Sequence, residues 1–300
     1  MPRLFKILLL IVTFTVITIT IKSADSQKKS SSIRKLTGRN VKVAIIDSGL
    51  NLGSPLLFSN VVATRNFIDD SESVLDDVGH GTQIASIIAA KPNTIGSFSG
   101  IAPEADLLIA KVLSHENNNI DYVTEALYWA VNNGAKLINI SLYYRKYNSE
   151  LKKAVDYAVK NNVIVISSAG NFGKNNIGYP ARFTETLSVF ATNSHGNLVD
   201  FSSYSPKSDV GAIGLNVKVA SYTNSKWNLL FENGTSYSAA IVTGYLSLLW
   251  QYYPECSAQS ILELFYNHLT YSNKDNNYYF WLNFKGSSFL TDLLGSELSS

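Results

Sequence analysis

Short apolar runs that alternate with amphipathic stretches extend from Val41 to about Tyr253, and they constrain the fold of this chain more than any other feature. A continuous apolar run predicts a strand buried on both faces of a parallel sheet. The runs of this kind are residues 41–46, 107–112, 137–142, 163–169 and 187–191. Because helical patterns lie between them, we predict an α/β fold: a doubly wound, three-layer α/β/α structure with a mostly parallel central sheet.

The helical patterns have recognisable faces and ends. Val123, Leu127 and Ala130 share one face, and Gly134 supplies a stop after them. Residues 151–158 repeat this pattern, whereas residues 81–90 and 236–250 are apolar throughout. Helices of the latter composition are predicted to be central and buried.

The two ends of the chain differ from this pattern. Arg3 and Lys6 precede an uncharged apolar run over residues 7–21, which is typical of an export signal and short for a membrane span of about 20 residues. We therefore expect an export signal or uncleaved N-terminal anchor in residues 1–24, and a secreted or surface-anchored protein. The remaining divisions are a polar linker over 25–39, one folded domain over 40–285 and a tail over 286–300.

Composition excludes several classes of function. The formal net charge of +2 is too small to favour nucleic-acid binding or electrostatic attachment to a membrane. Cys256 is the single cysteine, so an internal disulfide and a thiolate metal cluster are both excluded. We expect a monomer whose contact with a membrane, if any, is made by an uncleaved N-terminal segment.

Asp47 and His80 are the first candidates for chemistry. Asp47 ends the first apolar run, and ligands bind at the carboxyl ends of strands in open α/β sheets. His80 stands between Gly79 and Gly81 at the start of a helix, and imidazole suits proton transfer near neutral pH. Each has a structural alternative as a turn or helix cap. Asp76 and Asp77 also allow a metal site, but no second histidine has ligand spacing, so no metal is predicted.

Ser236 and Asn171 complete the set. Ser236 begins the long apolar helix after Gly234 and Thr235, where a hydroxyl is ordinarily an N-cap. The same position favours an anion, because backbone N–H groups and the helix dipole point to it. Asn171 follows the fourth apolar run, so its amide would reach the same sheet edge as a second donor to an oxyanion. The order Asp, His, Asn, Ser fits a serine-hydrolase triad with its orienting acid first.

Five segments together resemble the signature blocks of the subtilases: VAIIDSGL (43–50), GHGTQIAS (79–86), INISL (138–142), ISSAGN (166–171) and GTSYSAAIVTG (234–244). The resemblance covers Val41 to about Tyr253. It implies a serine endopeptidase with a peptide or protein substrate, in which Asp47 orients His80, His80 activates Ser236, and Asn171 stabilises the oxyanion of an acyl-transfer reaction.

The resemblance also implies where a substrate binds. Two extended segments flank the cleft in this family and pair with the substrate backbone. The residues that match them, with the adjoining pocket, are Asn117, Asn118, Asn119, Ser141, Leu142, Tyr143, Gly170 and Gly178. Tyr143 and Asn117–Asn119 stand where the family often has glycine, so bulkier cleft walls are expected.

Other positions depart from the family pattern. Phe172 stands where some relatives have an acid, which leaves a Lys or Arg preference unsupported, and Gln83 replaces a usual histidine. Leu56 stands where the family's strong calcium site has a carboxylate, although Asn93 matches another ligand. We therefore expect no required cofactor and no calcium at this site.

The biological role is left open among three alternatives. The short segment before Val41 offers no room for a long prodomain, and small subtilases of this kind include leader peptidases that mature lantibiotics. We expect an endopeptidase that processes a precursor or leader peptide of this type. The alternatives are a catalytically silent homologue that acts as a peptide-binding or immunity module, and an esterase or acyl transferase.

Overall fold

The structure is a computed structural model that describes residues 36–51, 57–69, 71–92, 94–205, 208–274 and 277–283. The predicted export signal (1–24), most of the linker (25–39) and the tail (286–300) lie outside the described residues. The account below concerns the compact unit that begins at Leu36.

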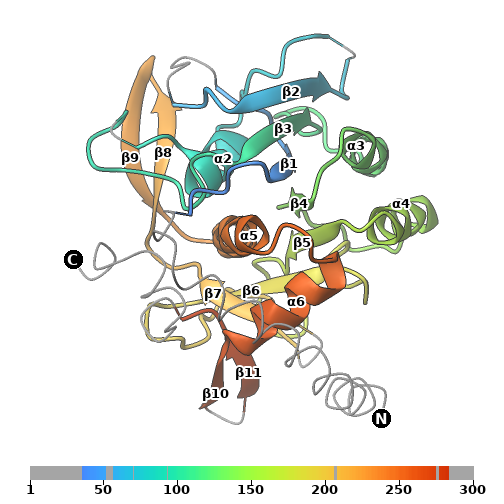
Figure 1. The fold of residues 1–300 in the computed structure, drawn as a ribbon, viewed down its shortest axis with the longest axis vertical. Helices are drawn as coiled ribbons and strands as arrows, with labels where there is room; N and C mark the ends of the chain where they lie inside the picture. The colour runs from blue at the N-terminus through green and yellow to red at the C-terminus, as the bar shows by residue number, and fades with distance from the viewer. Residues whose placement is uncertain are drawn as a thin grey trace. The chain divides into compact units, whose positions relative to one another are not determined.

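Nine strands form one sheet, in the order β10-β11-β7-β6-β5-β4-β1-β3-β2, and all neighbouring pairs except β10–β11 are parallel (Figure 1). A separate antiparallel hairpin consists of β8 and β9. The strands are β1 (Lys42–Asp47), β2 (Val61–Asn66), β3 (Asp106–Lys111), β4 (Leu137–Ile140), β5 (Ile164–Ser168), β6 (Leu187–Thr192), β7 (Val210–Ile213), β8 (Val217–Thr223), β9 (Lys226–Glu232), β10 (Thr270–Lys274) and β11 (Asn277–Trp281).

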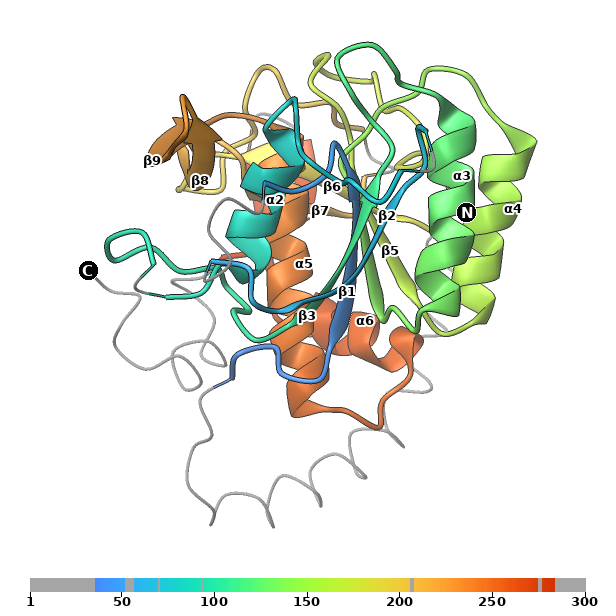
Figure 2. The same cartoon turned by 90° about the horizontal axis from the view of Figure 1, so that it is seen from above.

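Helices cover both faces of this sheet, as Figure 2 shows: α2 and α5 lie on one side, and α3 and α4 lie on the other. The helices are α2 (His80–Ala89), α3 (Ile120–Asn132), α4 (Ser149–Lys160), α5 (Thr235–Tyr252) and α6 (Ala258–Asn267). The predicted three-layer α/β/α fold is thereby confirmed.

The apolar run of β1 shows why these strands lack the alternation of a half-exposed strand. Val43 and Ile45 belong to the core cluster that includes α2 and α5, whereas Ala44 and Ile46 belong to the cluster that includes α3 and α4. Each residue is therefore buried against one helical layer or the other. Burial on both faces fixes the register of β1, and with it the position of Asp47 at its end.

The packed part of the chain begins earlier than residue 40, where the sequence placed the domain boundary. Leu36 is buried, and the backbone N–H groups of Thr37 and Gly38 donate to Gln251 Oε1 at 2.8 and 2.7 Å. The Ser- and Lys-rich composition of the predicted linker hid these contacts, because they join residues more than 200 positions apart.

No helix within the described residues is both long and apolar enough to span a membrane.

Candidate active site

The predicted residues gather at the carboxyl ends of β1, β4 and β5. Asp47 is the last residue of β1, Ser141 follows β4, and Asn171 lies shortly after β5. The strand order changes direction here, because the chain runs from β1 to the edge strand β2, comes back to β3 beside β1, and then continues to β4 on the other side of β1. A crevice at such a switch point is where open α/β sheets bind ligands.

Asp47 and His80 are in direct contact. The His80 Nδ1 atom lies 2.7 Å from Asp47 Oδ1, and the same oxygen accepts the N–H of Ser48 at 2.8 Å. Because a carboxylate only accepts hydrogen bonds, Nδ1 carries the proton, and Nε2 of the neutral ring keeps a free lone pair. Asp47 is buried, whereas 25% of the His80 side chain is exposed. The imidazole that can act as a base is therefore partly exposed to solvent, whereas the carboxylate that orients it is buried.

Glycine allows this close approach of β1 and α2. A Cβ on Gly81 would lie 2.3 Å from the carbonyl oxygen of Gly49, so no larger residue fits without moving the backbone. Gly49 itself has a φ of +107°, which L side chains rarely adopt. The N–H of Gly81 donates to Ser48 Oγ at 2.8 Å and joins the two segments. Gly49 and Gly81, which follow the catalytic candidates, thus have a packing role.

Electrostatics around His80 favour its charged form. Burial works against a charge on the ring, but the Asp47 carboxylate in contact with it, together with Asp76 and Glu232, outweighs burial and raises the pKa of His80 above its ordinary value. An imidazolium formed during a reaction would therefore be stabilised where it arises.

Ser236 lies in the first turn of α5, next to the start of α2. The ring of Tyr237, the following residue, has its centroid 6.0 Å from that of His80, and its hydroxyl donates to Gln83 Oε1 at 2.8 Å. Gln83, which replaces a usual histidine of the family, thus links the two helices. Within the described residues, no hydrogen bond joins Ser236 Oγ to the His80 ring. Such contacts are often long before substrate binds and shorten in the reacting complex.

The amide of Asn171 has a defined orientation. Its Oδ1 accepts the N–H and the hydroxyl of Thr235, each at 3.0 Å. Because a backbone N–H can only donate, the oxygen must face Thr235, and Nδ2 is left to donate elsewhere. The first N–H groups of a helix, including that of Ser236, have no acceptor within the helix. The site therefore offers two donors to a developing oxyanion.

The residues predicted to bind substrate lie in the segments that follow β3, β4 and β5. Ser141 Oγ donates to the Ser236 carbonyl oxygen at 3.4 Å. Tyr144 Oη donates to Asn118 Oδ1 at 2.8 Å, which joins the segment after β4 (residues 141–144) to the segment after β3 (residues 112–119). We call these two segments the rim of the site. Asn118 pairs with Leu113 in an antiparallel bridge. The side chain of Asn119 is not directed to a substrate, since it caps α3 by accepting the N–H of Asp121 at 3.0 Å.

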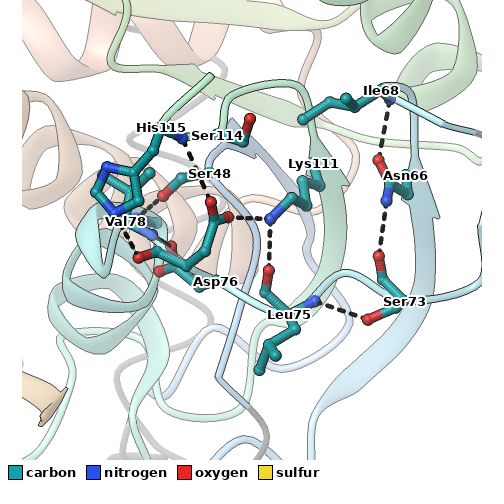
Figure 3. A network of polar contacts seen from close by, with 12 residues as sticks. Ser48, Asn66, Ile68, Ser73, Leu75, Asp76, Val78, Lys111, Ser114 and His115 are labelled. Atoms are coloured by element: carbon teal, nitrogen blue, oxygen red, sulfur yellow. Dashed lines mark hydrogen bonds and ion pairs between the residues drawn. The ribbon is translucent and has the colours of Figure 1, made fainter. Parts of the chain in front are cut away.

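A polar network ties the loop before His80 to β3 and to one rim segment (Figure 3). Lys111 donates to the carbonyl oxygen of Leu75 at 2.5 Å and forms an ion pair with Asp77. His115, on the rim, places Nε2 2.9 Å from the Asp77 carbonyl oxygen. Asp77 is thus a structural partner in this network, although the pair Asp76 and Asp77 also suggested a metal site in the sequence.

No group of three or more His, Cys, Asp or Glu side chains in the described part of the chain is placed to hold a metal ion. Leu56 and Asn93, on which the calcium expectation rests, lie outside the described residues. The expectation that no cofactor is required therefore stays a prediction.

The sequence did not predict the structural roles of two residues of the site. Thr235 orients Asn171 although 64 positions separate them. Asp76 Oδ2 accepts the N–H and the hydroxyl of Thr82 at 2.8 and 2.6 Å, and so supports the first turn of α2. The sequence signal for Asp76 was its place four residues before His80; Thr235 offered only its place beside Ser236.

Comparisons with known proteins agree with this geometry. A family model described as "Subtilase family" matches residues 38–281. The chain is 35% identical over 253 residues to subtilisin BL and to subtilisin Savinase, both from Lederbergia lenta, with 84% of this chain and 91% of each relative covered. It is also 35% identical over 237 residues to the major intracellular serine protease of Bacillus subtilis strain 168, covering 75% of this chain and 73% of that protein.

The crystal structure of a cold adapted subtilisin-like serine proteinase is similar to this chain, with a TM-score of 0.73. The similarity covers 82% of this chain and 89% of that one, at 24% sequence identity. At this identity, the likeness shows the fold alone.

Proposed function

This chain belongs to the subtilase family and is a subtilisin-like serine endopeptidase, and on that premise we propose that it hydrolyses peptide bonds through Ser236, His80 and Asp47. Its substrate is a peptide or protein. The observation that carries the assignment of residues is the 2.7 Å contact between Asp47 and His80, formed beside the N-terminus of the helix that bears Ser236.

The geometry supports a two-step acyl transfer. Ser236 Oγ attacks the scissile carbonyl while His80 Nε2 accepts its proton, and Asp47 stabilises the imidazolium. Asn171 Nδ2 and the Ser236 N–H donate to the oxyanion. His80 then gives the proton to the leaving amine, and water, deprotonated by His80, releases the acyl group from Ser236. None of these steps requires a cofactor. We therefore expect kcat/KM of the folded protein to be the same before and after dialysis against a chelator.

Hydrolysis of a defined peptide mixture tests the proposal. The wild-type protein should produce new peptide termini that mass spectrometry detects, and Ser236→Ala should produce none above background. Ser247→Ala is a matched control, because this serine is on the same helix and, among the described residues, its hydroxyl bonds only to the Thr243 carbonyl oxygen at 2.9 Å. A folded wild-type protein that binds the peptides without cleaving them would instead indicate the silent peptide-binding homologue.

We further propose that the natural substrate is a precursor or leader peptide, such as that of a lantibiotic. The Tyr143 ring, packed against Phe172, and the Asn118 side chain, bonded to Tyr144, lie beside the site, which favours a restricted set of peptides over general digestion. Incubation with a lantibiotic precursor should give one cleavage site, whereas denatured casein should be cut slowly. Rapid cleavage of casein at many sites would contradict this proposal.

The proposal of export rests on Arg3 and Lys6 before the apolar run over residues 7–21. We propose a secreted or membrane-anchored monomer, with residues 40–285 as the catalytic domain and residues 25–39 as a linker whose last residues, from Leu36, pack on that domain. The N-terminal sequence of the protein recovered from culture medium and from washed membranes distinguishes cleavage from anchoring. Recovery in the cytoplasm alone would contradict export.

A further inference from the structure

The site defines where the residue on the acyl side of the scissile bond must place its side chain. In the reaction proposed above, on which this inference rests, the carbonyl oxygen of that substrate residue lies between Asn171 Nδ2 and the Ser236 N–H. The segments beside that point follow β4 and β5 and contain Ser141 and Gly170. Ser141 Oγ lies 3.4 Å from the Ser236 carbonyl oxygen, so the β4 end reaches the reactive serine. We therefore expect the acyl-side side chain to enter between these two segments.

The ring of Tyr143 occupies this space. A Cβ built on Gly170 would lie 2.7 Å from Tyr143 Cδ2, and one built on Gly178 would lie 2.3 Å from the same atom. Real Cβ contacts essentially never fall below 3.0 Å. The ring therefore lies directly on the backbone of both glycines, and only glycine fits beneath it at either position.

Backbone hydrogen bonds join the segment that contains Tyr143 to those that contain Gly178 and Ala169. Tyr144, next to Tyr143, pairs with Tyr179, next to Gly178, through N–H to carbonyl hydrogen bonds of 3.0 and 2.8 Å. The Gly178 N–H donates to the Ala169 carbonyl oxygen at 3.3 Å, which joins this bridge to the end of β5.

The open side of the ring is covered by Phe172. The two ring centroids are 4.5 Å apart at an interplanar angle of 46°, a separation typical of favourable aromatic pairs. Arg145 in turn lies over Phe172, 5.7 Å from its centroid. Displacing the Tyr143 ring would break its contact with Phe172 and uncover the two glycines.

We propose that Tyr143 fills the pocket for the acyl-side residue and limits cleavage to bonds that follow Gly, Ala or Ser. A larger side chain would need the volume that the ring holds, and packed interiors resist added volume strongly. One methylene changes discrimination by about 10- to 200-fold, so a whole aromatic ring should be rejected by at least about 100-fold in kcat/KM relative to Ala. Tyr143 is thus a specificity-determining residue of this chain.

A peptide series that differs only at the acyl-side position, with Gly, Ala, Ser, Leu, Phe or Lys, tests this proposal. The concentration of active enzyme is measured by titration with a fluorophosphonate, so that kcat/KM values of variants are comparable. The wild type should prefer Ala to Phe by about 100-fold or more. Tyr143→Ala should lower that ratio at least about tenfold by accelerating cleavage after Phe. Tyr143→Phe, which keeps the ring, should retain the wild-type ratio.

The outcomes separate this inference from the proposed function. A wild-type enzyme that is labelled by the fluorophosphonate and cleaves after Phe or Leu as fast as after Ala overturns the role of Tyr143 and leaves the peptidase proposal intact. A folded wild type that is neither labelled nor active on any peptide overturns the proposed function itself. If Tyr143→Ala does not fold, Tyr143→Leu should shift the ratio in the same direction, and the wild-type series is decisive without either variant.

Discussion

At the scale of single residues, the site depends on side chains whose orientation is set by one neighbour each. Asp47 fixes the tautomer of His80, and Thr235 fixes the amide of Asn171. Both fixing contacts are hydrogen bonds of 2.7 to 3.0 Å to groups that have only one possible role as donor or acceptor. A substitution can therefore remove the reactive atom of such a side chain while it keeps the hydrogen bond that orients the side chain.

Asn171→Asp separates the two roles of Asn171. The aspartate keeps an acceptor for the Thr235 N–H, but it replaces the donor Nδ2 with a negative oxygen. We expect kcat to fall by at least about 10²–10³-fold, the effect of losing one oxyanion donor, while the free energy of unfolding changes little. Steady-state kinetics and urea unfolding of the same preparation measure both. Asn176→Ala, on the same loop, should retain kcat; an unchanged kcat in Asn171→Asp would exclude Asn171 from the oxyanion site.

The raised pKa of His80 determines the acid side of the pH profile. Only the neutral ring can accept the proton of Ser236, so kcat/KM falls as pH falls through the pKa of His80. Since the Asp47 carboxylate raises this pKa, the fall should begin above the ordinary imidazole value of about 6.5. The pH dependence of kcat/KM measures this midpoint. His195→Gln, which changes an exposed histidine, should not move it, and a midpoint well below 6.5 would contradict the account.

At the scale of elements, the start of α2 is supported from outside the helix. Gly79 is the N-cap and offers no side chain, so Asp76 supplies the acceptors instead. Its two oxygens accept the N–H groups of Gly79 and Thr82 at 2.7 and 2.8 Å and the Thr82 hydroxyl at 2.6 Å. Because His80 is the first residue of α2, a helix that begins differently would also displace the imidazole from Asp47.

Asp76→Ala should therefore reduce both stability and activity. The loss of hydrogen bonds from buried groups to a carboxylate is expected to lower the free energy of unfolding by about 2–4 kcal/mol. Activity should fall through kcat, because the His80 ring loses its position. Urea unfolding and steady-state kinetics test this. Glu150→Ala, which removes an exposed ion pair with Lys153, should change stability by less than about 0.5 kcal/mol; an equal effect of both substitutions would refute the support of α2 by Asp76.

At the scale of the whole molecule, α5 is the central packing element. Every residue from Thr235 to Trp250 is buried, and the helix packs along β4 to β7. Its N-terminus carries Ser236, so the precision of the site depends on how α5 fits against the sheet and the loop at Ile101. A Cβ on Gly244 would lie 2.8 Å from Ile101 Cβ, which shows how close this fit is.

Gly244→Ala should destabilise the protein despite the better helix propensity of alanine. Propensity favours alanine by about 1 kcal/mol, but overpacking costs about 1–3 kcal/mol, so the net change is a loss of about 1 kcal/mol. In an Ile101→Gly background, where the opposing Cβ is absent, the same substitution should no longer destabilise. Urea unfolding of the four proteins in this cycle measures the coupling, and additive effects would contradict the contact.

The sequence predicted five strands that are buried on both faces and the helices α2 to α5, but it missed the short buried strand β7 and the more exposed strand β2. The run over residues 41–46 became β1, and the apolar stretch over 236–250 became most of α5. Strand β2 was missed because most of its residues are partly or fully exposed, which gives no apolar run. The sequence also predicted which types of residue form the site and that they lie at one edge of the sheet. The packing of Tyr143 on Gly170 and Gly178 did not, because contacts between distant loops leave no local pattern.

The central claim is that Ser236 is a nucleophile activated by His80, and covalent labelling tests it most directly. A fluorophosphonate probe, followed by digestion and mass spectrometry of the labelled peptide, should place the label on Ser236 of the wild-type protein. Labelling should be absent from Ser236→Ala and much slower in His80→Ala, with both variants folded by circular dichroism. A folded wild-type protein that takes no label, or takes it at another serine, would contradict the account.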